Sequence, residues 1–253
     1  MKLSYLSLLP LTLASPLSLS PRQSATKCGL WDSVSSGRYT VYANQWGAST
    51  AGTTGSQCFT VTSSSSASSL AWYTTWTWAN NPNQVKTYTN VQTVGFPKKA
   101  VSAYTSMATS WTWSYTGTNL VANVAYDVFL GASPSSSHQF EVMVWLGLYG
   151  NASPLSANGY PFTPIANTTI GGVVFDLAYG LNGDVKVYSF VARSRAQTTF
   201  AGDLRDFFTF LTRGYATNGF TGSLVVQDVQ SGTEVFTGSQ GRLTTSGYTM
   251  SIT

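Results

Sequence analysis

Apolar and polar residues alternate along most of this chain. Segments 37–42, 70–78 and 107–115 show the alternation clearly and are rich in Thr, Val, Tyr and Trp, with Gly, Ser, Asn and Pro between such segments. A period of two is that of a strand with one buried face, and many short strands separated by turn residues are typical of a sandwich of two sheets. The sequence therefore predicts an all-β sandwich, and no internal repeat is evident.

One segment has the spacing of a helix instead. Leu204, Phe207, Phe208 and Leu211 recur at intervals of three and four within 202–214, with Asp203 in the first turn and a glycine at the end. An acidic start and a glycine stop are typical of helix ends. We expect one helix there. The serine-rich stretch 63–69 is short enough to be a connection between strands.

The N-terminus has the features of an export signal. Residues 1–15 combine an early lysine, an apolar run at 6–13 and a small-residue exit, as a secretory signal does. That run is shorter than the roughly 20 residues that cross a bilayer, and no later segment is longer and equally apolar. We expect a secreted, extracellular protein without a membrane span, with 16–27 as a short leader or flexible N-terminus and 28–253 as one folded domain.

Two further features agree with export. Cys28 and Cys58 are the only cysteines, and an even count in an oxidising compartment favours a disulfide over free thiols. Asn151 and Asn167 each begin an Asn-X-Ser/Thr triplet, which predicts N-glycosylation although the pattern is frequent by chance.

Composition excludes several classes of protein. The 253 residues are 14% aromatic and only 9% charged, with a formal net charge of +4, so disorder, coiled coil and nucleic-acid binding are disfavoured. His138 is the only histidine and no nucleophile motif lies near it. A Ser-His-Asp triad, a zinc site and any other metal or cofactor requirement are therefore not expected.

The most informative feature is a scarcity of glutamate, because Glu141 and Glu234 are the only two in the chain. In the apolar strand around Glu141, a period of two places Glu141, Met143 and Trp145 on one face and apolar residues on the other. The apolar face belongs in the core. The face with the carboxylate, thioether and aromatic ring then looks into a cleft or solvent, where it suits the C–H faces and hydroxyls of a sugar.

Paired carboxyl groups on either side of a scissile bond are what glycoside hydrolysis requires. Glu141 and Glu234 are candidates for that pair. Asp127, in an apolar strand just before Glu141, is a candidate to hold the nucleophile by hydrogen bonding. Each has a simpler interpretation: Glu141 as a solvent-facing or ion-paired residue, Glu234 as an ordinary strand end, and Asp127 as a cap for the following turn.

The tryptophans have two possible roles. Rows of tryptophan on single strands can be sugar platforms or core between two sheets, and the core is the commoner role for large aromatics; this applies to Trp72, Trp76, Trp78, Trp111 and Trp113. Trp46 is a better binding candidate, because Asn44 shares its face and can bind a sugar hydroxyl.

Several motifs together resemble those of glycoside hydrolase family 12, in order from residue 28 to the C-terminus. The two around the glutamates are the specific ones, and the others are weak singly; the set is CGLW at 28–31, NQWG at 44–47, GSQC at 55–58, AYD at 125–127, FEVMVW at 140–145, VYSFVA at 187–192 and GTEVFTG at 232–238.

The resemblance implies a β-jelly roll of two antiparallel sheets, an open concave cleft and one helix on the outer face. It also implies retaining endo-hydrolysis of β-1,4-glucans, with Glu141 as nucleophile, Glu234 as acid/base and Asp127 as the supporting aspartate. A Cys28–Cys58 disulfide is similar to the family's. Positions that fall along the cleft are Asn44, Trp46, Met143, Trp145 and Asn182.

One departure from the family pattern is Val235, where members usually carry proline; its loss would loosen the strand that holds Glu234. Segment 146–155 resembles cellulase-type members more than xyloglucan-specific ones. We therefore expect a secreted, monomeric cellulase-type endoglucanase acting on a polysaccharide. Two alternatives stay open: a xyloglucan-specific endo-β-1,4-glucanase, and a non-catalytic glucan-binding protein or secreted effector on the same sandwich.

Overall fold

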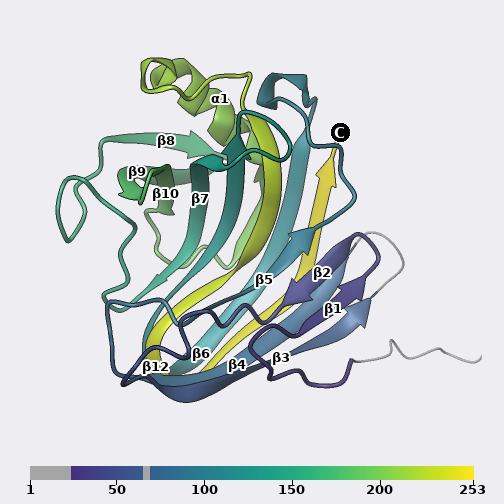
Figure 1. The fold of residues 1–253 in the computed structure, drawn as a ribbon, viewed down its shortest axis with the longest axis vertical. Helices are drawn as coiled ribbons and strands as arrows, with labels where there is room; N and C mark the ends of the chain where they lie inside the picture. The colour runs from purple at the N-terminus through teal and green to yellow at the C-terminus, as the bar shows by residue number, and fades with distance from the viewer. Residues whose placement is uncertain (1–23, 65–68) are drawn as a thin grey trace, which may run out of the picture.

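The computed structural model describes residues 24–64 and 69–253, and it confirms the all-β jelly-roll sandwich (Figure 1). The predicted signal at 1–15 and most of the predicted leader lie outside the described residues. Residues 24–27, the end of the predicted leader, are part of the fold and run beside the third strand: Ser24 N–H donates to Val61 O and Lys27 N–H to Phe59 O. Among the described residues, no helix has the length and apolar character that a bilayer span needs.

The inner layer is a nine-stranded run with the order β1-β2-β5-β12-β6-β7-β10-β9-β8. Its strands are β1 (Ser33–Ser36), β2 (Tyr39–Tyr42), β5 (Thr87–Thr93), β12 (Val225–Ile252), β6 (Met107–Gly131), β7 (His138–Tyr149), β10 (Val185–Ala192), β9 (Val173–Asn182) and β8 (Ala166–Ile170). All neighbours in it are antiparallel except β7 and β10, which run parallel. This one pair departs from the expected antiparallel arrangement, since β8 and β9 lie between them in sequence but beyond β10 in the sheet.

The outer layer is built from β3 (Thr54–Ser64), β4 (Leu70–Ala79), β11 (Thr199–Asp203), the C-terminal half of β12 and the N-terminal half of β6. The two long strands therefore belong to both layers. They bend near Gly117 and Gly238, whose φ angles of 142° and 147° lie outside the region that side chains favour. Figure 1 shows the resulting strong curvature of β6 and β12.

The space between the layers is filled by large apolar side chains. Trp72 and Trp111 are fully buried, and Trp76, Trp78 and Trp113 are exposed by 4% or less. The predicted tryptophan rows are therefore core and not sugar platforms. Predicted strands 70–78 and 107–115 lie within β4 and β6, and the alternation at 37–42 ends in β2.

The predicted helix forms as α1 (Leu204–Gly214), two residues shorter at its start than the expected 202–214. Asp203 is its N-cap and accepts a hydrogen bond from Arg205 N–H, so it precedes the first turn instead of lying in it. Phe207 packs against Phe175 of β9 and Phe190 of β10, with ring centroids 5.1 and 4.9 Å apart. The helix thus covers the apolar face of the inner layer, opposite the face that carries Glu141.

The N-terminal segment is tied down by the predicted Cys28–Cys58 disulfide, which the structure contains. Cys58 lies in β3, so the bond fixes the chain that leads to Trp31 and β1 against the outer layer.

Candidate active site

The three candidate acids lie on the concave face of three neighbouring strands. Glu141 of β7 pairs with Phe129 of β6, Asp127 of β6 pairs with Met143 of β7, and Glu234 of β12 pairs with Tyr88 of β5. The residues on either side of each acid point into the core, as a period of two requires. Glu234 and Glu141 are therefore separated by β6 and displaced along it, and the bend of these strands turns them toward a common space.

The Tyr88 hydroxyl marks that common space. Its side chain is 5% exposed and its hydroxyl donates to Ala125 O at 3.2 Å. Burial raises its pKa well above the ordinary value, and the charges of Asp127, Glu234 and Glu141 raise it further. Since such fields weaken with distance, the structure brings all three acids into one cluster.

Glu141 is 8% exposed, and burial raises its pKa to about 7. Hydrogen bonds from Asn182 and Asp127 act in the opposite direction, because they stabilise the ionised form. Asp127 has its own pKa raised well above the ordinary value, first by burial and then by the charge of Glu141. Asp127 therefore holds a proton and donates it in a hydrogen bond to the Glu141 carboxylate.

Glu234 is held by a single residue, Asn123 of β6. Asn123 Nδ2 donates to Glu234 Oε2, and Asn123 Oδ1 accepts from Glu234 N–H at 2.8 Å. Burial raises the pKa of Glu234 to about 7, and the charge of Glu141 is the second cause. The charge of ionised Glu141 therefore disfavours ionisation of Glu234, so the state with Glu141 ionised and Glu234 protonated is favoured over the state with both ionised. One ionised and one protonated carboxyl group is what a nucleophile and a general acid require.

Met143 and Trp145 share the face of Glu141, as the alternation predicts, but they are covered. Their exposed fractions are 5% and 2%, and Ala152 and Phe162 from the loop after β7 pack in the same cluster. Trp145 Nε1 donates to the Met143 sulfur at 3.4 Å. Trp145 therefore does not offer a free ring face, and it supports the floor beneath Glu141.

A hollow of about 330 Å³ continues the concave face toward the N-terminal strands. The candidate Asn44 lines it, together with residues that sequence reasoning missed: Trp31, Tyr42, Asn90, Gln92 and Gln230. Trp31 is 67% exposed, and the buried Asn90 has an Oδ1 with no partner among the described residues. An exposed aromatic plate beside an unsatisfied amide oxygen fits a pyranose ring and its hydroxyls.

Three of these missed residues could have been found in the sequence. Gln230 shares the period of two with Gly232 and Glu234, so it lies on the same face as the acid. Asn90 and Gln92 share a face with Tyr88 in the same way. Asn123 gave no sequence signal, because its role depends on which strand lies beside Glu234.

Trp46 is not among the residues that line the hollow, although it is 49% exposed. The following residue, Gly47, lies against the backbone of the segment that leads into β5: an added Cβ would come within 2.2 Å of Val85 O. This close approach holds the turn that carries Trp46 against that segment.

Other candidate positions lie away from the acids. The glycosylation candidates Asn151 and Asn167 are both exposed, after β7 and on β8. Val235 is fully buried beside Trp76, Trp78 and Ala122, so it is packed tightly despite the absence of a proline. Within the described ranges, no group of three or more His, Cys, Asp or Glu side chains could hold a metal ion.

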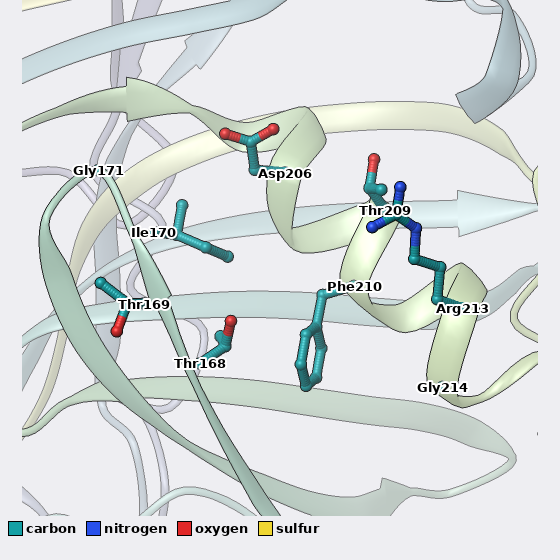
Figure 2. Close-up of a pocket in the computed structure, with 9 residues that line it drawn as sticks. All are labelled: Thr168, Thr169, Ile170, Gly171, Asp206, Thr209, Phe210, Arg213 and Gly214. Atoms are coloured by element: carbon teal, nitrogen blue, oxygen red, sulfur yellow. The ribbon is translucent and has the colours of Figure 1, made fainter.

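A second hollow of about 570 Å³ lies between β8 and α1 and is shown in Figure 2. Thr168, Phe210 and Arg213 are among its lining residues, and none of the candidate acids is. The acid cluster on the concave face is therefore the site with the chemistry.

The chain is similar to known glycoside hydrolases. The model described as glycosyl hydrolase family 12 matches residues 37–253. Xyloglucan-specific endo-beta-1,4-glucanase A of Aspergillus aculeatus is 44% identical over 252 residues, covering 100% of both chains. A probable xyloglucan-specific endo-beta-1,4-glucanase A of Neosartorya fischeri is 44% identical over 243 residues, covering 96% of this chain and 98% of that protein.

Solved structures of glycoside hydrolases are also similar to this chain. Endoglucanase 3 of Trichoderma harzianum, from family GH12, superposes with a TM-score of 0.81 at 37% identity, covering 90% of this chain and 97% of that one. The catalytic domain of Humicola grisea Cel12A, in complex with a soaked thio cellotetraose, superposes with a TM-score of 0.82 at 32% identity, covering 90% and 99%.

Proposed function

Because the chain belongs to glycosyl hydrolase family 12, we propose that it is a retaining endo-β-1,4-glucanase with Glu141 as nucleophile and Glu234 as acid/base. The observation that carries the proposal is the acid cluster itself. The only two glutamates of the chain share one concave face, where burial raises both pKa values and the charge of Glu141 disfavours ionisation of Glu234.

In the first step, a Glu141 oxygen attacks the anomeric carbon while the bond to the leaving glucan breaks and Glu234 gives its proton to the departing oxygen. Asp127 and Asn182 hold the Glu141 carboxylate in place through their hydrogen bonds. In the second step, Glu234 takes a proton from water, and the water oxygen displaces Glu141 from the sugar. The chemistry needs no metal or cofactor.

We propose xyloglucan as the preferred substrate. This departs from the cellulase-type preference expected from segment 146–155, and its support is that the full-length relatives at 44% identity are named for xyloglucan. Unbranched β-1,4-glucan is the second candidate. It is favoured by the likeness to an endoglucanase and to a domain bound to a thio cellotetraose.

We also propose that the enzyme acts outside the cell as a monomer. The export features of 1–15 and the Cys28–Cys58 disulfide support secretion. The soluble glucan is then the only partner that the site requires.

The test compares initial rates of reducing-sugar release from xyloglucan, barley-type β-glucan and carboxymethyl-cellulose, with Glu141→Ala as the blank. Preference for xyloglucan, absent in the blank, supports the proposal; preference for β-glucan supports the second candidate. Proton NMR of the first product adds the stereochemistry. A β-anomer is expected, and an α-anomer formed first would refute the role of Glu141 as nucleophile.

A further inference from the structure

A chain of hydrogen bonds, half-buried at Tyr115 and fully buried at Thr233, leads from the core between the layers to the candidate acid/base. Trp76 Nε1 and the Tyr115 hydroxyl are 2.9 Å apart, and the Tyr115 hydroxyl and Thr233 Oγ1 are 3.0 Å apart. Thr233 Oγ1 in turn donates to the backbone oxygen of Asn123 at 2.5 Å. Trp76 is 3% exposed, and Thr233 and Asn123 are fully buried.

The chemistry of these groups fixes the direction of every bond. An indole N–H can only donate, so Tyr115 accepts from Trp76. The single hydroxyl proton of Thr233 is used on the Asn123 carbonyl, so Thr233 must accept from Tyr115. Burial raises the pKa of Tyr115 well above its ordinary value, which keeps its donating proton in place. None of these groups has an alternative hydrogen-bond arrangement that satisfies all the others.

This series of hydrogen bonds ends at Asn123, the residue that holds Glu234. The backbone of Asn123 receives the Thr233 bond on the core side of β6, and its side chain lies on the concave side. There the amide contacts Glu234 twice, at the carboxylate and at the backbone N–H. The Glu234 carboxylate is therefore held by Asn123, and Asn123 is in turn held by the hydrogen bond from Thr233 as well as by the pairing of β6 with β7.

We propose that Tyr115 and Thr233 are positioning residues for the proton transfer by Glu234, acting through Asn123. Neither touches substrate, since both face the space between the layers. The inference rests on the proposed function, because it requires Glu234 to be the acid. Removing one of these hydrogen bonds is expected to slow the step that needs the proton by about 3- to 10-fold, which is the net worth of one buried bond.

The experiment uses Tyr115→Phe, which removes one oxygen and keeps the ring that packs against Trp76 and Tyr149. Tyr149→Phe is the matched control, because Tyr149 packs on the same core and takes no part in these hydrogen bonds. Thr233→Val is a second variant of nearly the same volume, for use if Tyr115→Phe folds poorly. The substrates are phenyl and 2,4-dinitrophenyl β-cellotriosides, which differ in how much the leaving oxygen needs a proton.

The readout is kcat/KM, which reports the first, bond-breaking step. We expect Tyr115→Phe and Thr233→Val to lower it about 3- to 10-fold on the phenyl substrate and to leave it unchanged on the dinitrophenyl substrate. Tyr149→Phe should match the wild type on both. Equal losses on the two substrates, or no loss, would overturn the inference and leave the proposed function standing. Wild-type inactivity on both substrates, and on xyloglucan and β-glucan as well, would overturn the proposed function, and the inference with it.

Discussion

Replacement of Glu141 by Gln should stabilise the fold at neutral pH while removing activity. Glu141 is 8% exposed, and its pKa rises from 4.5 to about 7, mainly because burial penalises the charged form. Glutamine keeps the shape and carries no charge. Its Oε1 can accept the hydrogen bonds of Asn182 and Asp127, and its Nε2 can donate to Asp127 Oδ1, which has no partner in the described part of the chain.

Proton linkage determines how the free energy of unfolding changes with pH. Because the folded-state pKa is raised, the native state binds more protons than the unfolded state between pH 4.5 and about 7. The stability associated with Glu141 is fully present below pH 4.5 and is lost as the pH rises to about 7. A rise from 4.5 to about 7 corresponds to about 3 kcal/mol at 1.36 kcal/mol per pH unit.

The assay is thermal unfolding of wild type and Glu141→Gln at pH 4 and pH 7. The two proteins should melt together at pH 4, and the variant should melt about 6 to 12 °C higher at pH 7, since 1 kcal/mol moves the Tm of a chain this size by about 2 to 4 °C. Asp184→Asn, at an exposed position between β9 and β10, is the control and should change little at either pH. A variant that is no more stable than wild type at pH 7, or equally stabilised at both values, would refute the reasoning.

Three further predictions follow from the site and the fold. The profile of kcat/KM against pH should be bell-shaped: its acid limb reports deprotonation of Glu141, and its alkaline limb, with a fall above about pH 7, reports loss of the Glu234 proton; a rate independent of pH from 4 to 9 would contradict both roles. Trp31→Ala should raise KM about 3- to 10-fold with kcat nearly unchanged, measured on a soluble oligosaccharide, because the exposed ring lines the hollow. Reduction of Cys28–Cys58 should lower the free energy of unfolding by about 3 to 4 kcal/mol, as expected for a 30-residue loop, and an unchanged urea midpoint would show that the loop is held by other contacts.

Local sequence was enough to predict the elements. The period of two in 70–78 and 107–115 and the helical spacing of Leu204, Phe207, Phe208 and Leu211 are set by neighbouring residues, and each produced the expected strand or helix. The same alternation placed Glu141, Met143 and Trp145 on one face. Scarcity then singled out the two glutamates, since no other position in the chain offered that side chain.

Pairing between distant strands decided the rest. The neighbour of Glu234 is Asn123, which no sequence pattern marked, because strand order and register depend on the whole sheet. The loop after β7 folds over Trp145 and buries it, although the strand alone predicts an accessible face. The raised pKa values of both glutamates have the same origin, since only the bend of β6 and β12 brings the acids together in a place that water scarcely reaches.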